Sequence, residues 1–371
     1  MGTKIISFVK KETILCISFL LAVISAFFVH PDSEYMNYVD WHTLMLLFSL
    51  MAVMAGLQHL GVFRKIGVTL LSHTENTKQL ALILVFLPFF FSMLITNDVA
   101  LITFVPFAII VLKLADREIM LVPIVILQTV AANLGSMLTP MGNPQNLYLF
   151  SQSKMSIAAF LTLMLPYTIA AALCLLIVIF FFKKKGIDMI DMENDCNISK
   201  LLFFMYLILF SLCLLCVLDI IDVKVVTAIT IIFLIIFDRK IFPSIDYSLL
   251  GTFIGFFIFI GNMGRLPQFH NFIENLIVGN EAPVSILSSQ ILSNVPSALL
   301  LSGFTDNWNA LIVGTNLGGL GTLIASMASL ISYKQIARNY PGKKTSYLIW
   351  FTITNIIMLS ILFAIYLFIN E

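Results

Sequence analysis

The chain has 371 residues, of which 60% are hydrophobic and 11% are charged, whereas about 25% of the residues of a soluble domain are charged. Its formal net charge is +1, and the 21 basic residues form no cluster of the kind that binds nucleic acid. These values exclude an ordinary soluble domain and a nucleic-acid-binding protein, and they predict an all-α polytopic membrane protein.

Apolar segments long enough to cross about 30 Å of hydrocarbon recur along the chain. Interrupted helices are expected at 119–150 and 307–333, and re-entrant helical hairpins at 79–115 and 283–304. Short amphipathic stretches begin at Arg64 and Arg265, and they are either interfacial helices or connecting loops. Continuous spans are expected at about 13–29, 42–60, 157–182, 200–218, 223–237, 247–262 and 345–369.

The basic residues favour one orientation of this arrangement, because Lys and Arg accumulate on the cytoplasmic side of membrane proteins. With a cytoplasmic N-terminus, only Lys154, Lys224 and Arg265 fall outside. Treating 79–115 as a single span would invert every later segment and remove this asymmetry. We therefore predict a multi-pass protein of the cell membrane with a cytoplasmic N-terminus. The cytoplasmic set is Lys4, Lys10, Lys11, Arg64, Lys65, Lys78, Lys113, Arg117, Lys183, Lys184, Lys185, Lys200, Arg239, Lys240, Lys334, Arg338, Lys343 and Lys344.

Two stretches in different halves of the chain share a pattern. NLGSMLTPMGNPQN begins at Asn133 and NLGGLGTLIASMAS begins at Asn316, and Thr139 matches Thr322 at the same offset. A polar tip precedes each stretch: TNDVALI in the first hairpin and SNVPSALL in the second. The same four elements therefore recur in the same order, namely a span, an amphipathic stretch, a hairpin and an interrupted helix.

The charge count places the two hairpins on opposite sides of the membrane, which predicts inverted repeats. We expect a first repeat at 1–199, a linking span at 200–222 and a second repeat at 223–371. Inverted repeats with interrupted helices are typical of secondary transporters.

The interruptions indicate where ions or solutes bind, since non-helical backbone at membrane depth survives only inside protein or beside water. Freed carbonyls suit a cation, and the N–H groups of the next half-helix suit an anion. Glycine, serine and threonine here also suit simple helix packing. In the first half the candidate residues are Thr96, Asn97 and Asp98, facing Asn133, Gly135, Ser136, Thr139, Gly142 and Asn143. In the second half they are Ser293, Asn294 and Ser297, facing Thr315, Asn316, Gly318, Gly319 and Thr322.

Asp98 is the most unusual of these residues, because a carboxylate at the bilayer centre costs about 2.5–3.5 kcal/mol. Such a group is expected to hold a cation or a proton, and it would repel an anion unless neutralised. Hard cations prefer oxygen ligands. The candidate sodium ligands are Asn97, Asp98, Thr139, Asn294, Asn316 and Thr322.

Several functional classes find no support in the sequence. It contains no nucleotide-binding, zinc-protease or paired catalytic-aspartate motif, so we do not expect an enzyme. GNPQN occurs once, and its counterpart in the second half contains Ala325 and Ser326, which disfavours a water channel with two Asn-Pro boxes. No cofactor is expected beyond a sodium ion or a proton as the coupling ion.

The motifs NDVALITFVPFAI, NLGSMLTPMGNPQNLYLF, SNVPSALLL and GTNLGGLGTLIASMASLISYKQ resemble those of the ion-transporter superfamily. That superfamily includes citrate-transporter-like permeases, arsenite permeases and one class of sodium–proton antiporters, and the arsenite-permease branch is the most similar. The resemblance covers nearly all of the chain from about residue 40. It implies a scaffold beside a mobile transport domain, elevator-type movement and a homodimer.

The resemblance does not identify the solute. The di- and tricarboxylate branch carries Ser-Asn-Thr at each hairpin tip, but here the tips read Thr96-Asn97-Asp98 and Ser293-Asn294-Val295-Pro296. Three functions therefore stay open. The first is a sodium- or proton-coupled transporter of a small anionic or oxyanionic solute in the lipid bilayer, from the citrate, dicarboxylate, arsenite or inorganic anion classes. The second is a sodium–proton antiporter that uses Asp98, and the third is a non-transporting sensor or structural subunit.

Overall fold

A computed structural model describes residues 12–71, 74–187 and 198–370 of the chain. These residues form α-helices joined by short 3-10 helices, and no β-strand occurs in the described ranges. The predicted all-α fold class is confirmed. Lys4, Lys10 and Lys11 lie outside the described residues, so the orientation of the N-terminus stays a prediction.

The first half of the chain contains two long apolar helical units with breaks in the middle. In chain order the elements are α2 (Thr13–Phe28), α3 (Tyr35–Tyr38), α4 (Trp41–His59), α5 (Val62–Leu71), α6 (Thr77–Phe91), α7 (Asn97–Leu114), η1 (Glu118–Met120), α8 (Leu121–Ser136), η2 (Pro140–Gly142), α9 (Pro144–Ser153) and α10 (Ile157–Phe180). The breaks between α6 and α7 and between α8 and α9 fall inside the ranges 79–115 and 119–150, where a hairpin and an interrupted helix were expected.

The second half repeats this alternation of long helices and broken ones. Its elements are α11 (Lys200–Val217), α12 (Val223–Phe237), η3 (Arg239–Ser244), α13 (Tyr247–Gly264), α14 (Pro267–Ile277), α15 (Glu281–Leu292), α16 (Asn294–Ser302), α17 (Trp308–Leu317), α18 (Met327–Asn339), η4 (Pro341–Lys343) and α19 (Lys344–Asn370). The amphipathic stretches that begin at Arg64 and Arg265 fall in short helices, α5 and α14, so of the two alternatives the helical one is correct. Their place at the membrane interface stays a prediction.

Within the described residues, seven helical segments are long and apolar enough to cross a membrane. They are Trp41–His59, Asn97–Leu114, Glu118–Ser136, Ile157–Phe180, Lys200–Val217, Tyr247–Gly264 and Pro341–Asn370. Three shorter apolar helices, α2, α6 and α12, accompany them. The chain is therefore a multi-pass membrane protein.

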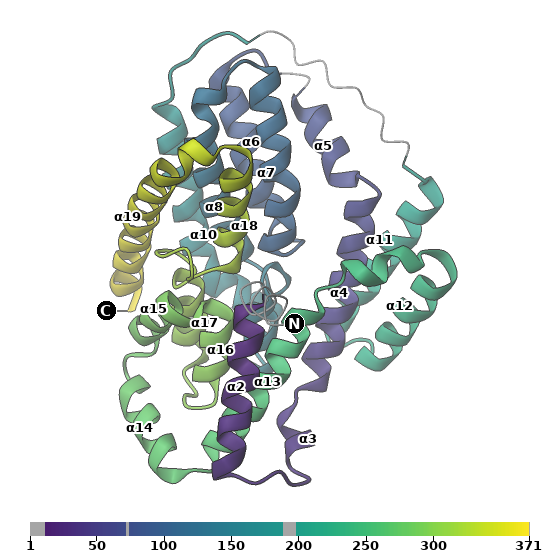
Figure 1. Ribbon diagram of the computed structural model, residues 1–371, viewed down its shortest axis with the longest axis vertical. Coiled ribbons are helices and arrows are strands. Elements are labelled where there is room, and N and C mark those ends of the chain that lie inside the picture. The colour runs from purple at the N-terminus through teal and green to yellow at the C-terminus, as the bar shows by residue number, and fades with distance from the viewer. Residues whose placement is uncertain (1–11, 72–73, 188–197, 371) are drawn as a thin grey trace, which may run out of the picture.

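The helices form two side-by-side groups (Figure 1). Helix α4 packs on α11 and α12 at one side of the molecule, while α6, α7 and α8 pack together with α10, α18 and α19 at the other. Helices α15, α16 and α17 form a smaller cluster, and α2 lies along α13. Helix α4 also contacts α7 and α9, and α13 contacts both α4 and α16. These two helices therefore lie beside the boundary where the polar residues of the centre are found.

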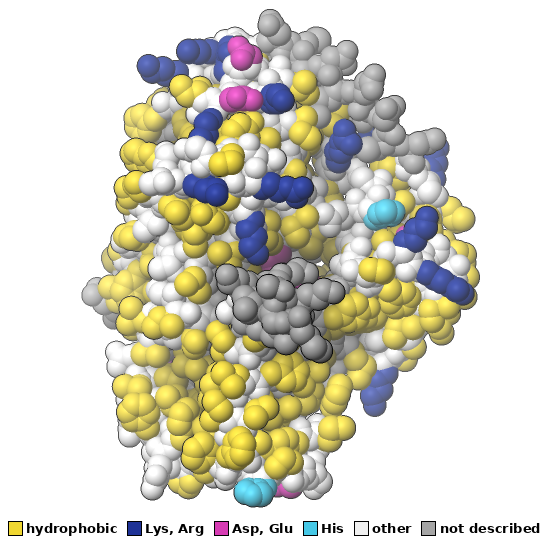
Figure 2. All heavy atoms as spheres, in the orientation of Figure 1, with side chains coloured by type: hydrophobic (Ala, Val, Ile, Leu, Met, Phe, Trp, Pro, Cys, Tyr) yellow, Lys and Arg dark blue, Asp and Glu magenta, His cyan; other side chains and the backbone are white. Residues whose placement is uncertain are grey.

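The two ends of the α6–α7 hairpin lie at the same end of the molecule. The backbone N–H of Thr77, where α6 begins, donates to the carbonyl of Lys185 over 2.9 Å. Arg117, three residues after α7, donates to the carbonyl of Gly186 over 3.0 Å. Most Lys and Arg side chains of the visible face also lie toward this end (Figure 2). A helix that goes in and returns explains this arrangement, although a re-entrant path through the bilayer stays a prediction.

Candidate functional site

The break between α8 and α9 is produced by proline and glycine. Pro140 begins η2 and Pro144 begins α9, positions where the missing N–H of proline breaks no hydrogen bond. At Gly142, an added Cβ would lie 2.1 Å from the carbonyl oxygen of Ser136. No side chain fits there, so glycine is required for the chain to fold back on the end of α8.

The break between α17 and α18 relies on glycine alone. Helix α17 ends at Leu317, and Gly321 adopts a φ of +108°, a conformation that favours glycine. The backbone then reaches Ser326, the residue that precedes α18. Both predicted interrupted helices are therefore present, with their breaks next to Asn133 and Asn316.

Each hairpin packs against the break of the helix that follows it. In the first half, the hydroxyl of Thr139 donates to the carbonyl of Met93, and an added Cβ at Gly135 would lie 2.8 Å from Ser92 Oγ. In the second half, the hydroxyl of Thr322 donates to the carbonyl of Gln290 over 3.1 Å.

The two sets of hairpin contacts occupy matching positions. Met93 and Gln290 each lie four residues before the tip asparagines, Asn97 and Asn294. An added Cβ at Gly318 would lie 2.6 Å from Ser289 Oγ, just as Gly135 faces Ser92. Gly135 and Gly318 follow Asn133 and Asn316 by the same two residues. The two halves therefore use the same contacts to dock a hairpin on a broken helix.

Asn133, in the last turn of α8, links three elements. Its Oδ1 accepts hydrogen bonds from Asn97 Nδ2 at 2.9 Å and from Ser326 Oγ at 3.0 Å. Its Nδ2 donates to Ser329 Oγ at 3.5 Å. Asn133 is 4% exposed, so these bonds form inside the protein, between the first hairpin, α8 and the start of α18.

Asn316, in the last turn of α17, has the corresponding role. Its Oδ1 accepts from Asn143 Nδ2 at 3.3 Å, and its Nδ2 donates to Asn146 Oδ1 at 2.6 Å. The same Nδ2 donates to the carbonyl of Ile312 at 2.8 Å. Asn316 is 3% exposed, and it joins α17 to the start of α9.

The hydrogen bonds of Asn133 and Asn316 connect the two halves of the chain. Each asparagine accepts from the residue that lies ten positions after the other one, and donates to the residue thirteen positions after the other one. Reciprocal contacts of this kind are expected between two repeats that a two-fold axis relates, and the inverted repeat itself stays a prediction. The residues concerned are Asn133, Asn143 and Asn146 in the first half and Asn316, Ser326 and Ser329 in the second.

These hydrogen bonds bring the N-terminal ends of helices together at the centre. Helix α7 begins at Asn97, which contacts Asn133, and α18 follows Ser326, which contacts the same amide. Helix α9 follows Asn143, which contacts Asn316, and the N–H of Asn294 at the start of α16 donates to the carbonyl of Ala325 over 2.9 Å. Among the described helices, α7, α9, α16 and α18 thus point their positive dipole ends at one region.

The carbonyls freed at the breaks already accept hydrogen bonds from side-chain amides. Asn146 Nδ2 lies 3.3–3.4 Å from the carbonyl oxygens of Ser136, Met137 and Thr139. Gln290 Nε2 donates to the carbonyls of Gly318 and Leu320 at 3.1 and 2.9 Å. The carbonyls that were expected to suit a cation are therefore partly satisfied by the protein itself.

The remaining predicted residues divide into three groups. Ser136 and Thr315 donate within their own helices, as a packing role requires. Gly319 faces the amide of Asn294, from which an added Cβ would be 3.0 Å away. Ser297 is fully buried, and its hydroxyl has no hydrogen-bond partner in the part of the chain that is described.

Asn146, Gln290, Ser326 and Ser329 were not expected to belong to the site. The alignment of the two Asn-Leu-Gly stretches already pairs Asn143 with Ser326 and Asn146 with Ser329. A polar residue opposite a polar residue in the two aligned stretches was the signal that could have found Asn146, Ser326 and Ser329, but it does not reach Gln290, which matches Met93. No such signal exists for Asp246, which reaches the site from η3 and α13.

A polar cavity of about 140 Å³ adjoins this centre. Its walls are α4, the tip of the α6–α7 hairpin, the start of α9 and the junction of η3 with α13. Thr96, Asp98, Asn143 and Asp246 line it, and none of its described lining residues is Lys, Arg or His. Its polar groups are two carboxylates, amides and hydroxyls, set among leucine and methionine side chains.

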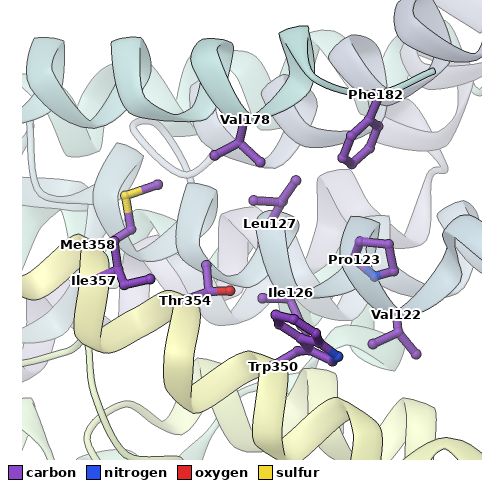
Figure 3. Close-up of a pocket in the computed structure, with 10 residues that line it drawn as sticks. All are labelled: Val122, Pro123, Ile126, Leu127, Val178, Phe182, Trp350, Thr354, Ile357 and Met358. Atoms are coloured by element: carbon purple, nitrogen blue, oxygen red, sulfur yellow. The ribbon is translucent and has the colours of Figure 1, made fainter. Parts of the chain in front are cut away.

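A larger cavity of about 420 Å³ lies elsewhere, between α8, α10 and α19 (Figure 3). Trp350, Ile357 and Met358 of α19 face Val178 of α10 and Phe182, two residues after the end of α10, across it. Thr354 contributes a hydroxyl, but the lining is otherwise apolar apart from the indole nitrogen. This cavity suits hydrocarbon, so the polar centre is the better candidate for an ion or a polar solute.

Comparison with known proteins decides the family. The family model described as citrate transporter matches residues 4–307. The chain belongs to the citrate transporter family. As a member of that family it is a membrane transporter and not an enzyme, which confirms the resemblance to the ion-transporter superfamily and sets aside a non-transporting role.

The relatives of this citrate-transporter family member agree with that assignment. The chain is 32% identical over 304 residues to an uncharacterised transporter of Methanocaldococcus jannaschii, covering 81% of this chain and 82% of that one. It is 29% identical over 300 residues to the inner membrane protein YbiR of Escherichia coli, covering 80% of each. It is 34% identical over 143 residues to the silicon efflux transporter of Oryza sativa, covering 38% of this chain and 29% of that one.

Proposed function

We propose that this transporter is a secondary active carrier of a small anionic or oxyanionic solute, driven by a sodium or proton gradient. The candidate solutes are citrate, dicarboxylates, arsenite, silicate and inorganic anions. Silicate enters because a relative is named as a silicon efflux transporter. One observation carries the proposal: the N-terminal ends of α7, α9, α16 and α18 meet around the two buried asparagines, Asn133 and Asn316. Helix N-termini bind anions.

The coupling cation supplies charge that the protein lacks. The only charged side chains among the described residues that line the cavity are Asp98 and Asp246, so an anion would meet amides, hydroxyls and helix ends but no basic side chain there. A sodium ion or a proton at Asp98 removes the repulsion between its carboxylate and the solute. This is the physical reason to expect symport.

The expected route of transport is an elevator movement. The matching contacts of the two halves support an inverted repeat, and α4, α11 and α12 form a group beside the hairpins and broken helices. In our proposal the first group is the scaffold of a homodimer, and the hairpins move with the broken helices past it.

Uptake into proteoliposomes tests the proposal. Purified protein is reconstituted, each radiolabelled solute is offered outside, and a sodium or proton gradient is imposed separately. Concentrative uptake of one solute under one gradient is the expected result. Absence of uptake for the whole panel, with protein that is folded and inserted, would count against it.

A sodium–proton antiporter is the second candidate, and it is favoured by the two carboxylates, Asp98 and Asp246, and the absence of Lys, Arg and His among the described residues that line the polar cavity. Asp98→Asn separates the two functions. A symporter is expected to keep part of its solute uptake, because the neutral amide does not repel an anion. An antiporter would lose exchange completely, because Asn binds no proton.

A further inference from the structure

The apolar cavity of about 420 Å³ between α8, α10 and α19 has no part in the proposed transport site. Two of its walls, α10 and α19, expose further apolar side chains, among them Phe180 and Ile349. Along α19 the lining runs from Trp350 to Met358, which is about 12 Å at a rise of 1.5 Å per residue. A long apolar space between helices that cross the membrane fits a hydrocarbon chain.

One end of this cavity lies where its three walls begin or end. Val122 is in the first turn of α8, Phe182 follows the end of α10 by two residues, and Trp350 is in the second turn of α19. Figure 3 shows Phe182 at one end of the cavity and Met358 at the other. The start of α19 is joined to the start of α8, since Lys343 Nζ donates to the carbonyl of Glu118 over 3.0 Å.

Basic residues stand next to this end on each of the three walls. Lys183 directly follows the lining residue Phe182. The predicted orientation places this end on the cytoplasmic side, and most of the visible Lys and Arg side chains lie toward it (Figure 2). The basic residues are Arg117 before α8, Lys183, Lys184 and Lys185 after α10, and Lys343 and Lys344 at the start of α19.

The three lysines after α10 are held by their backbone, while their charged ends are available. The hydroxyl of Thr77 donates to the carbonyl of Lys183 over 2.6 Å and accepts from the N–H of Lys185 over 3.0 Å. The side chains of 183–185 are exposed, and no carboxylate of the described ranges forms an ion pair with them. Positive charge beside an apolar cavity matches a molecule that joins a hydrocarbon chain to a negative headgroup.

We propose that this cavity binds one acyl chain of an anionic phospholipid, with the phosphate headgroup among the lysines of 183–185. Basic sites between membrane helices on the cytoplasmic side bind the headgroups of anionic lipids. Trp350 lies beside the same end of the cavity, and tryptophan favours the level of the headgroups. The site goes beyond the proposed function, because it uses no residue of the polar centre, yet one of its walls is α8, the helix that carries Asn133.

The test measures lipid binding to the full-length detergent-purified protein. A ligand that binds only the folded state raises its Tm with concentration, so phosphatidylglycerol and phosphatidylcholine with identical chains are titrated separately. The headgroup variant combines Lys183→Gln with Lys184→Gln. Its control combines Arg239→Gln with Lys240→Gln, which removes the same charge from exposed positions in η3.

A second pair of variants tests the place of the acyl chain. Val178→Phe adds a ring to the cavity, which Val178 lines. Ile177→Phe is the control, since Ile177 is the next residue of α10, is 58% exposed and does not line the cavity.

The wild type is expected to bind phosphatidylglycerol more tightly than phosphatidylcholine. The Lys183 and Lys184 variant should raise the half-maximal concentration of phosphatidylglycerol by about thirtyfold, since each basic residue near an anionic lipid contributes about 1 kcal/mol. Binding of phosphatidylcholine should not change in this variant, and the Arg239 and Lys240 variant should match the wild type. Val178→Phe should weaken binding of both lipids, and Ile177→Phe should not.

Equal binding of the two lipids by the wild type would overturn the inference. The acidic residues of 188–195, which lie outside the described residues, would produce that result if they neutralised the lysines. Equal effects of the two charge variants, or of the two phenylalanine variants, would also overturn it. Each of these outcomes leaves solute uptake, which tests the proposed function, to be judged by the proteoliposome assay alone.

Discussion

At the centre, asparagines form hydrogen bonds between helices and glycines allow close backbone contacts, neither of which larger apolar residues could provide. Asn133 and Asn316 are buried amides whose bonds cross between helices that lie far apart in the sequence. Buried amides that link elements in this way are expensive to disrupt, because each lost partner leaves another polar group unsatisfied. The glycines beside them permit backbone contacts that no Cβ allows.

Replacing Asn316 by Ala is expected to destabilise the protein. Asn143 Nδ2 and Asn146 Oδ1 would both lose a buried partner, at a cost of about 1–3 kcal/mol each. The Tm in detergent should fall clearly, and solute uptake should be lost. The control is Asn355→Ala, a buried amide that donates only to Phe351 of its own helix. Equal effects of the two substitutions would contradict a linking role for Asn316.

Replacing Gly135 by Ala is expected to push the hairpin off α8. The new Cβ would lie 2.0 Å from the carbonyl oxygen of Phe89, and overpacking of this kind costs about 1–3 kcal/mol. Tm and the yield of monodisperse protein measure the effect. Gly186→Ala is the control, since its Cβ meets nothing within 4 Å. A Gly135 variant as stable as the Gly186 variant would show that the hairpin is not docked as described.

At the scale of elements, each hairpin depends on one threonine of the following break. The hydroxyl of Thr139 bonds Met93 and that of Thr322 bonds Gln290, which makes the two docking contacts alike in geometry. They differ in exposure, since Thr139 is partly buried and Thr322 is exposed. Water can replace a lost bond at the second site but not readily at the first.

The valine variants of these threonines test this difference. Thr139→Val is expected to cost about 1 kcal/mol, and Thr322→Val less than about 0.5 kcal/mol, as for surface substitutions in general. Differential scanning fluorimetry of both variants measures the two losses side by side. A larger loss for Thr322→Val would mean that the second hairpin, not the first, is held by its threonine.

An ion pair ties the loop after α2 to the end of α13. Arg265 Nη1 lies 2.7 Å from Asp32 Oδ2, with both side chains partly exposed. The hydrogen bond from Arg265 lowers the pKa of Asp32 below its ordinary value. Because the folded pKa is the lower one, the pair stabilises the protein above the unfolded pKa of about 3.9, and this contribution is lost as the pH falls through the folded pKa.

Arg265→Gln is therefore expected to lower Tm slightly at pH 7 and to have no effect at a pH below the folded pKa of Asp32. The loss at pH 7 should shrink in high salt, since exposed charges are screened. Arg338→Gln, a change of one charge in the last turn of α18, corrects for net charge. A difference that persists at acid pH would assign the effect to packing of the long side chain instead.

At the scale of the whole molecule, the fold separates a helical group around α4 from the hairpins and broken helices. The polar cavity lies at the boundary, lined by α4 and α13 on one side and by the first hairpin and α9 on the other. A boundary that carries polar side chains on both faces, Gln58 and Asp246 on one and Asp98 and Asn143 on the other, suits relative movement better than a continuous apolar core does. The dimer of our proposal would hold the α4 group still while the other moves.

Cysteine accessibility tests this movement. Leu94 at the hairpin tip is 50% exposed, so Leu94→Cys in a cysteine-free background should react with a membrane-impermeant maleimide. The elevator movement predicts that the reactive side of the membrane changes when Na⁺ and solute are present. Glu34→Cys, in the exposed loop before α3, should react from one side throughout. Labelling of Leu94→Cys from a single side under all conditions would contradict the movement.

The sequence alone determined the class of the protein, the positions of its helices and both sets of breaks. Hydropathy and the placement of proline and glycine act locally, so they can be read along the chain. Asn97, Asn133, Asn143 and Asn316 were also predictable, because polar residues in apolar segments are rare. Their assignment to a solute or an ion stays a prediction.

Only the tertiary structure decided how these residues are paired. Asn143 and Asn316 are 173 residues apart. Nothing in the local sequence indicates that each half supplies hydrogen-bond partners to the buried asparagine of the other half. Asp246 is the clearest case, since in the sequence it is an ordinary residue before a helix. Its place opposite Asp98 follows from the packing of η3 and α13 beside the hairpin tip, and such long-range contacts depend on the whole fold.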